Sequence, residues 1–501
     1  MHQTGSTVTA QRPEHHSEGQ LQAPVASRVK KVRYIGLVGG LILAAFITLM
    51  LPAELNVAAR ITAGVVVLMG TWWMTEAVPI PVTALLPLVV FPAFGIAGID
   101  EVASSYANDT LFLFLGGFML ALGMQRWNLH RRIALRIVLL VGTRPTRLVA
   151  GLMIATALLG MWVSNTATAM MMIPLGMSVV SLVEAQQGVT KKSRFGVGLM
   201  LGIAYSATLS AFGTIVASPG NVFVVAYIEE NFDYRITFLQ WMMFGIPLGI
   251  IFMALGWFVI TKVLWRPEID ELPGGRALIV DELRSLGRMS AGETMVLVIF
   301  LATALSWVFV PVLFDDPWAT DPVIAMIAGI VVFTLPARPK DGIMLMDWDT
   351  ANRTPWGTMI LVGGGLALSA QIMSSGLSAW IGESLTALGG LPVWVLIPAV
   401  VLLMLLLTEF TSSMASITAF VPLVAGIAVS LGQDPVVIAI MVTQACQSAF
   451  MLPVASIPNA IAYGTGSVNI QQMVRTGLVF NLLGLVLVSC LGLFVLPHVL
   501  G

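Results

Sequence analysis

The stretch WVSNTATAMMMIPLG (Trp162–Gly176) decides the fold, because it places three adjacent polar residues inside strongly apolar sequence. A second stretch, FTSSMASITAFVPLV (Phe410–Val424), has the same form. In both, a proline lies ten residues after a serine of the polar group. Polar side chains in such surroundings need hydrogen-bond partners or a bound ligand. The two stretches therefore indicate paired sites within a membrane-embedded chain.

The composition of the chain indicates a membrane protein. Of its 501 residues, 57% are hydrophobic and 10% are charged, whereas a soluble domain has about 25% charged residues. This chain cannot supply the polar surface of a soluble protein, so lipid is expected to cover its outer face. The net charge of −1 argues against a nucleic-acid partner. Two cysteines allow at most one disulfide, and no Cys/His metal spacing is present.

Successive apolar runs predict an all-α polytopic membrane protein with about 11 transmembrane helices. Two of the runs, 148–186 and 391–431, have roughly twice the length of one crossing. Each contains one of the polar groups near its centre. We interpret both as re-entrant hairpins whose tips carry the polar residues.

The distribution of Lys and Arg predicts the orientation. Basic residues before the first apolar run place the N-terminus in the cytoplasm, and basic residues on both sides of 148–186 make that hairpin enter from inside. The ends of 391–431 contain no Lys or Arg, so the second hairpin enters from outside, and the C-terminus ends outside. The segment WNLHRRIALRIVLL (127–140) is expected to be an amphipathic helix on the inner face, with its arginines toward lipid headgroups. The predicted location is the plasma membrane.

Corresponding motifs recur in the same order in the two halves. ANDTLFLFLGGFMLAL (107–122) resembles ANRTPWGTMILVGGGLALS (351–369), and VASPGN (216–221) resembles VASIPN (454–459). Because the predicted sidedness of the copies is opposite, the pattern is typical of the inverted repeats of secondary transporters.

The repeat predicts four segments in the chain. Residues 1–33 are expected to form a disordered cytoplasmic tail, with metal binding by His15 and His16 as the alternative. The other three are a first transmembrane helix at 34–60, a first repeat at 61–275 with the inward hairpin, and a second repeat at 276–501 with the outward hairpin.

The polar segments favour coupled transport of an anion and a cation. The prolines near 217–221 and 455–459 should unwind two crossings locally, and unwound backbone at membrane depth must be buried in protein or line a cavity. Helix N-termini suit anions, and free carbonyls suit Na⁺. The four polar segments contain no Lys or Arg, so bound cations would supply the positive charge.

Other classes of function fit less well. No buried histidine lies near the serines, so the chain is not expected to be an enzyme. Hairpins that end within the membrane argue against an open channel. Glu409, directly before the second polar group, is either a proton-coupling group or a structural residue bonded to backbone.

Four stretches of the chain resemble motifs of a known family. MWVSNTATAMM (161–171), TEFTSSMA (408–415), LGGFMLALGMQRWNLHRRIAL (115–135) and MLPVASIPNAIAYGTGSV (451–468) are similar to motifs of the divalent anion/sodium symporters. These are Na⁺-coupled carriers of di- and tricarboxylates and sulfate, and the resemblance covers about residues 34–498. It implies a homodimer, a scaffold and a transport domain, and elevator-type alternating access.

The resemblance also implies a role for each residue of the polar segments. Substrate would be bound by the two tips and the second unwound segment, at Ser164, Asn165, Thr166, Ser412, Ser413, Met414, Ile457 and Pro458. A first Na⁺ site would use Ser164, Asn165 and Ala217. A second would use Thr408, Thr411, Ser413 and Ala455.

The second tip departs from the family pattern, because Ser413 and Met414 stand where Asn and Thr are usual. The function expected from the sequence is Na⁺-coupled import of C4-dicarboxylates such as succinate, malate or fumarate. The alternative is a dicarboxylate or tricarboxylate exchanger, or a sulfate carrier, with an altered or absent second Na⁺ site. No organic cofactor is expected.

Overall fold

The computed structural model describes most of the chain, in six stretches: residues 27–142, 144–187, 193–269, 274–314, 318–384 and 392–500. The described residues are almost entirely helical. Within these stretches, one short hairpin pairs β1 (Pro336–Arg338) with β2 (Ile343–Met344) in antiparallel register.

The first half of the chain forms helices α2 to α14. They are α2 (Ser27–Met50), α3 (Val57–Thr75), α4 (Ile80–Thr83), α5 (Leu86–Ala93), α6 (Ile99–Ser104), α7 (Asp109–Arg126), α8 (Leu129–Val141), α9 (Pro145–Gly160), α10 (Asn165–Gln187), α11 (Arg194–Leu209), α12 (Pro219–Phe232), α13 (Phe238–Phe258) and α14 (Gly275–Ser285). Two 3-10 turns, Ser210–Phe212 and Ile215–Ala217, lie between α11 and α12. A π-helical turn, Val259–Leu264, extends α13.

The second half forms helices α15 to α25. They are α15 (Ala291–Leu313), α16 (Asp321–Thr334), α17 (Trp348–Ala351), α18 (Trp356–Ser374), α19 (Leu377–Ser384), α20 (Val393–Thr408), α21 (Ser413–Ser430), α22 (Pro435–Cys446), α23 (Ile457–Gly464), α24 (Ile470–Cys490) and α25 (Leu496–Val499). A π-helical turn, Leu491–Val495, joins the last two.

The structure is that of an all-α polytopic membrane protein. Within the described residues, ten helical stretches of 18 residues or more are apolar enough to cross a bilayer. Many of their large apolar side chains are exposed, for example Ile35, Leu49 and Val312. A water-soluble protein does not expose apolar surface on this scale, so lipid is the natural contact of these faces.

Both double-length runs form helix pairs with a break at the polar group. The first run gives α9 and α10, separated by residues 161–164. The second gives α20 and α21, separated by residues 409–412. The predicted hairpin limits, 148–186 and 391–431, agree with the observed limits, 145–187 and 393–430, to within three residues.

Two predicted segments differ from the structure. Helix α2 begins at Ser27, so residues 27–33 are helical rather than part of a disordered tail, while residues 1–26 lie outside the described part. His15 and His16 fall in that outside part. The apolar run at 82–98, which by length predicts one crossing, instead consists of the short helices α4 and α5, because prolines at their first turns start new helices.

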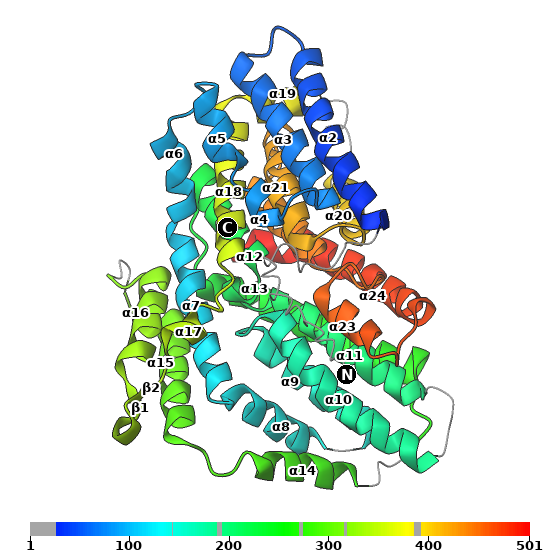
Figure 1. The fold of residues 1–501 in the computed structure, drawn as a ribbon. Helices are drawn as coiled ribbons and strands as arrows, with labels where there is room; N and C mark the ends of the chain where they lie inside the picture. The colour runs from blue at the N-terminus through cyan, green and yellow to red at the C-terminus, as the bar shows by residue number, and fades with distance from the viewer. Residues whose placement is uncertain are drawn as a thin grey trace, which may run out of the picture.

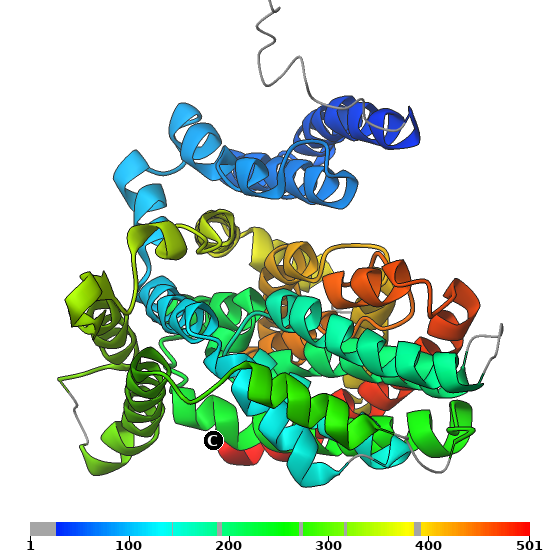
Figure 2. The same ribbon diagram turned by 60° about the horizontal axis from the view of Figure 1, so that its bottom comes forward.

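The helices form three groups around a large core. Figure 2 shows the N-terminal helices α2 to α5 as one layer beside the rest of the bundle. In Figure 1, α15, α16 and the β-hairpin flank α7 at the left, while α8 and α14 run along the bottom, below α9 and α10. The largest core cluster joins α8 to α13 with α20 to α24, so it contains both hairpins.

Helix α8 corrects one expectation about the amphipathic segment. Not all of its arginines face headgroups, since Arg132 is 4% exposed. Its guanidinium donates to Glu293 Oε1 at 2.7 Å and to the Gly287 carbonyl at 3.0 Å. A buried arginine needs such an ionic partner to offset its lost hydration. The pair therefore fixes α8 to the start of α15.

Candidate functional site

The first hairpin tip is the short turn between α9 and α10. Ser164 Oγ accepts a hydrogen bond from the backbone N–H of Ala167 at 3.2 Å, and Asn165 Oδ1 accepts one from the N–H of Thr166 at 2.9 Å. Serine and asparagine favour helix starts because their side chains can cap free amides in this way. Ser164, Asn165 and Thr166 are all half-buried, so their remaining hydrogen-bonding capacity is available at the tip.

The first broken crossing lies between α11 and α12, at residues 210–218. Asn221 is fully buried, and its Nδ2 donates to the carbonyls of Ala211 at 2.7 Å and Thr214 at 2.8 Å. One side-chain amide thus satisfies two carbonyls that the helix no longer pairs. The hydroxyl of Thr214 donates to the Met161 carbonyl at 2.5 Å, which ties this crossing to the first tip.

The second broken crossing, residues 447–456 between α22 and α23, uses the same arrangement. Asn459 is fully buried, and its Nδ2 donates to the carbonyls of Leu452 at 3.1 Å and Ala449 at 3.5 Å. These acceptors lie seven and ten residues before the asparagine, as they do for Asn221. The shared hydrogen-bond pattern supports a structural repeat in the two halves.

The second tip differs in its polar contacts. The Thr411 hydroxyl lies 2.7 Å from Ser416 Oγ and donates to the Leu407 carbonyl at 3.0 Å. Ser412 is the N-cap of α21, but its side chain makes no capping bond. Met414 packs against apolar core residues. The N-terminal amides of α21 therefore lack the side-chain cap that Ser164 gives to α10.

Contacts between the two halves bring the polar segments together. Gln447 Nε2 donates to Asn221 Oδ1 at 2.7 Å, in a buried hydrogen bond between the two broken crossings. Gly220 of α12 approaches Ile417 of α21 so closely that a Cβ there would lie 2.4 Å from Ile417 Cδ1. In the same crosswise manner, α23 packs against α10. Each broken crossing therefore contacts the hairpin of the other half.

The predicted cation ligands occupy matching places. Ala217 and Ala455 are both buried, and each directly precedes the serine that caps the next helix, Ser218 or Ser456. Their carbonyls lie at the ends of the two unwound segments, where oxygen ligands suit Na⁺. Thr408 is buried at the end of α20, where its hydroxyl donates to the Met404 carbonyl and its own carbonyl accepts from the N–H of Thr411 at 3.4 Å.

The prolines of the broken crossings have another role than the one expected. Pro219 and Pro458 do not unwind the chain; they are the first residue of α12 and the second residue of α23. Proline fits these positions because the N–H that it lacks is unpaired there anyway. The unwound backbone precedes them. Of the two substrate residues predicted here, Ile457 is exposed and Pro458 is buried.

The structure does not join the two tips directly. Among the described residues, no hydrogen bond links Ser164, Asn165 or Thr166 to Ser412 or Ser413. The tips are connected through the broken crossings. The sequence reasoning missed the residues that make this connection, Asn221, Asn459 and Gln447. The two asparagines could have been found from the matched strings VASPGN and VASIPN.

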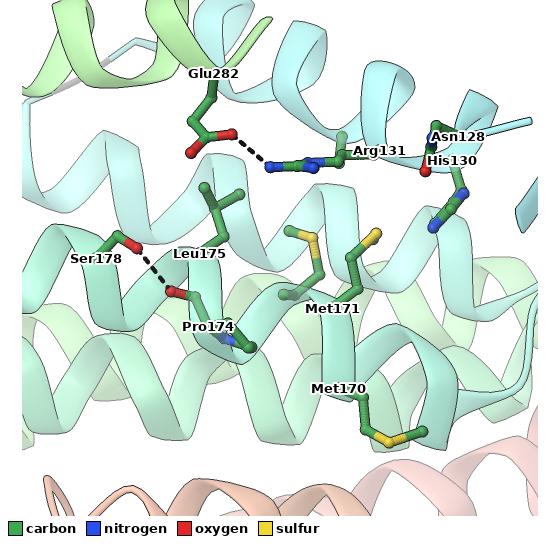
Figure 3. Close-up of a pocket in the computed structure, with 11 residues that line it drawn as sticks. Asn128, His130, Arg131, Met170, Met171, Pro174, Leu175, Ser178 and Glu282 are labelled. Carbon is green, nitrogen blue, oxygen red and sulfur yellow. Dashed lines mark hydrogen bonds and ion pairs between the residues drawn. The ribbon is translucent and has the colours of Figure 1, made fainter. Parts of the chain in front are cut away.

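A cavity of about 360 Å³ lies away from the tips, between α8, α10 and α14. Figure 3 shows His130 and Arg131 of α8 facing Met171 and Leu175 of α10 across it. Arg131 pairs with Glu282 at 2.5 Å on its rim. Burial lowers the pKa of His130, so its imidazole is neutral near pH 7. The hairpin helix α10 is thus not tightly packed against α8 along this stretch.

The chain is similar to known transporters over nearly its whole length. The family described as "Sodium:sulfate symporter transmembrane region" matches residues 31–498. A "Sodium-dependent dicarboxylate transporter SdcS" of Staphylococcus saprophyticus is 37% identical, with 93% of this chain and 92% of that protein covered. A protein of the same name from Staphylococcus aureus (strain USA300) is also 37% identical, with 95% and 94% covered.

A solved structure shares the fold at low sequence identity. It is described as the crystal structure of the Alcanivorax borkumensis YdaH transporter, which reveals an unusual topology. The TM-score is 0.54 at 15% identity, and the match covers 93% of this chain and 97% of that one. Since the family match spans nearly the whole chain, this protein belongs to the sodium:sulfate symporter family, whose members are transporters rather than enzymes.

Proposed function

We propose that this protein imports C4-dicarboxylates such as succinate, malate or fumarate together with Na⁺. One observation carries the proposal: each hairpin tip contacts a broken crossing, and the buried Gln447–Asn221 hydrogen bond joins the two crossings. Free helix N-terminal amides and free carbonyls at one location suit an anion and its accompanying cations. The relatives named sodium-dependent dicarboxylate transporters support the same choice of substrate and ion.

Within this proposal, the two tips have different tasks. Ser164, Asn165 and Thr166 bind substrate, and Ser164 and Asn165 also bind the first Na⁺ with the Ala217 carbonyl. The polar capacity left at this half-buried tip supports that assignment. The second substrate contacts are Ser412, Ser413 and Met414, with Ile457 and Pro458 beside them. The second Na⁺ is bound by Thr408, Thr411, Ser413 and Ala455.

A second candidate function rests on the second tip. Ser413 is shorter than the asparagine in the matching place of the first tip, and Met414 packs with apolar side chains. Losing a hydrogen bond to a charged group costs about 1.5–3 kcal/mol. A second Na⁺ site weakened by that amount would favour exchange of di- or tricarboxylates, or sulfate transport, over Na⁺-driven uptake.

The larger architecture is part of the proposal. Residues 61–275 and 276–501 form two repeats of opposite orientation, and the shared asparagine pattern supports their equivalence. The protein is a homodimer in the plasma membrane, with the N-terminus inside and the C-terminus outside. The hairpins move as part of an elevator-type transport domain. The cavity between α8 and α10 supports relative movement of these helices.

The test is uptake of labelled succinate into proteoliposomes containing the purified protein. We expect an inward Na⁺ gradient to drive accumulation, and an equal K⁺ gradient to drive none. Unlabelled malate, fumarate, citrate and sulfate then compete in separate reactions, with and without Na⁺. Uptake that needs internal dicarboxylate and ignores Na⁺ would instead identify an exchanger, and competition by sulfate alone would identify a sulfate carrier.

A further inference from the structure

Glu409 is a buried carboxylate at the second tip, with 2% of its surface exposed. Its Oε1 accepts hydrogen bonds from the N–H groups of Phe450 at 2.9 Å and Met451 at 3.0 Å. Its Oε2 accepts from Met451 at 3.0 Å and from Leu452 at 3.1 Å. Asn481 Nδ2 of α24 also donates to Oε1, at 2.7 Å. All of these contacts come from N–H donors.

No cationic side chain balances this carboxylate within the described part of the chain. The ion pairs there join other residues, and none includes Glu409. An ionised carboxylate only accepts hydrogen bonds, and the four surrounding groups are all neutral donors. A buried charge is costly unless a partner compensates it. Neutral amides satisfy its oxygen atoms but leave its net charge in place.

The position of Glu409 joins the two parts of the proposed second Na⁺ site. On the hairpin, it lies between Thr408 and Thr411. On the broken crossing, it holds the amides of residues 450–452, which lead directly to Ala455. The carboxylate therefore fixes the backbone that supplies the cation's oxygen ligands from both sides.

The first tip has no such charge. The matching residue, three places before the first serine of the tip, is Met161. Its carbonyl accepts from Thr214, and its side chain lies so close to Gly213 that a Cβ there would be 2.5 Å from Met161 Cε. The first tip retains Asn165, whereas the second has Ser413 in the matching place. The buried charge is thus found at the tip that lacks the amide ligand.

We propose that Glu409 is a positioning residue of the second Na⁺ site. It holds the backbone of this site through residues 450–452, and its negative charge attracts the cation. The inference rests on the proposed Na⁺-coupled transport. It adds that binding of Na⁺ at this site depends on a carboxylate that does not itself have to touch the ion.

The test is a Na⁺ titration of succinate uptake by the full-length protein in proteoliposomes. Glu409→Gln keeps the size of the side chain and removes its charge. We expect the Na⁺ concentration for half-maximal uptake to rise about tenfold, as for loss of one nearby unit charge. The maximal rate and the KM for succinate, both at saturating Na⁺, should stay within about twofold of wild type on the same grounds. Glu409→Asp should recover part of the Na⁺ affinity.

The matched control is Glu230→Gln, which also removes a carboxylate that accepts from an asparagine, here Asn108 at 2.7 Å. Glu230 is exposed and far along α12 from the tips, so its Na⁺ titration should match wild type. Adding Ser413→Asn to Glu409→Gln should restore Na⁺ affinity. If Glu409→Gln does not fold, Asn481→Ala provides a second test, because it keeps the charge of Glu409 and removes one of its hydrogen-bond donors. The Na⁺ concentration for half-maximal uptake should then shift less in Asn481→Ala than in Glu409→Asp.

Several outcomes would overturn the inference. One is an unchanged Na⁺ titration in well-folded Glu409→Gln, and another is a loss of maximal rate alone, which indicates a purely structural role. Uptake driven by a proton gradient in wild type and lost in Glu409→Gln would make the residue a proton carrier. Wild-type uptake with no Na⁺ dependence is a separate result, because it removes the proposed function itself.

Discussion

The two hairpin tips have the same helix–turn–helix backbone but different polar side chains. The first has Ser164, Asn165 and Thr166 beside the neutral Met161, and one hydroxyl bond from Thr214 ties it to its broken crossing. The second has Ser412, Ser413 and Met414 beside Glu409, whose carboxylate receives bonds from three consecutive amides of its own crossing. The difference teaches that the shape of a repeat can persist while the source of its electrostatic stabilisation changes.

The largest expected effect is at the first tip, which has the complete Ser-Asn-Thr sequence. Asn165→Ala should reduce Na⁺-dependent succinate uptake to background, because this amide is proposed to contact both substrate and the first Na⁺. Each lost bond to a charged group costs about 1.5–3 kcal/mol. Initial rates in proteoliposomes measure the effect. Asn231→Ala is the control, since that side chain donates only to the Tyr227 carbonyl. Normal uptake by Asn165→Ala would refute the tip assignment.

The next effect compares the two broken crossings. Asn221→Leu leaves the Ala211 and Thr214 carbonyls without this donor, and Gln447 Nε2 keeps only its longer bond to the Thr443 carbonyl at 3.4 Å. The substitution should destabilise the protein by about 3 kcal/mol or more. Asn459→Leu should cost less, because its hydrogen bonds are longer. Thermal unfolding midpoints in detergent rank the two variants. Equal midpoints would show that the two crossings are held equally firmly despite their different geometry.

The third prediction concerns a substitution that makes the second tip more similar to the first. Ser413→Asn gives the second tip the amide oxygen of the first, and should lower the Na⁺ concentration for half-maximal uptake by about 3- to 10-fold, which is the size expected for one added hydrogen-bonding ligand. The Na⁺ titration of uptake is the measurement. A Met414→Leu variant, which adds no polar atom, should leave the Na⁺ dependence less changed. A weaker Na⁺ response in Ser413→Asn would mean that Ser413 does not face the ion.

The smallest effect concerns the cavity beside the first hairpin. Burial lowers the pKa of His130; the Met124 carbonyl opposes this shift and the charge of Arg131 adds to it. The unfolded chain therefore binds the proton first as the pH falls, so the stability from neutral His130 is full above its unfolded pKa of about 6.5 and declines below it. Unfolding midpoints of wild type should fall more than those of His130→Gln between pH 7.5 and 5.5. Parallel curves would exclude this role.

Much of the fold was predictable because apolar length and polar interruption have direct physical consequences in a bilayer. The limits of both helix pairs followed from run length, and the breaks at the tips followed from the polar groups near the centres of the runs. The prolines were harder to interpret. A proline can end a helix or begin one, and local sequence does not distinguish these cases; Pro219 begins α12.

The positions of the polar segments along the chain were predictable, but the contacts between these segments were not. The sequence identified the tips, and it left Glu409 open between two roles. It could not identify Gln447 as the partner of Asn221, because these residues are 226 positions apart and only the packing of α12 against α22 brings them together. Arg132 is a second case in which a contact distant in sequence could not be predicted. The pattern of its helix is amphipathic, yet this arginine is buried because it pairs with Glu293, 161 positions away.

The hydrogen bond from Gln447 to Asn221 also has a consequence for the order of events during biosynthesis. Asn221 leaves the ribosome 226 residues before its donor, which corresponds to roughly 10 to 45 s at 5–20 residues per second. For that interval the first broken crossing must enter the membrane without the helices that later cover it. The Asn221 amide can already donate to the Ala211 and Thr214 carbonyls in that interval, but its own Oδ1 has to wait for Gln447. The contact between the two broken crossings therefore forms only after Gln447 has been made.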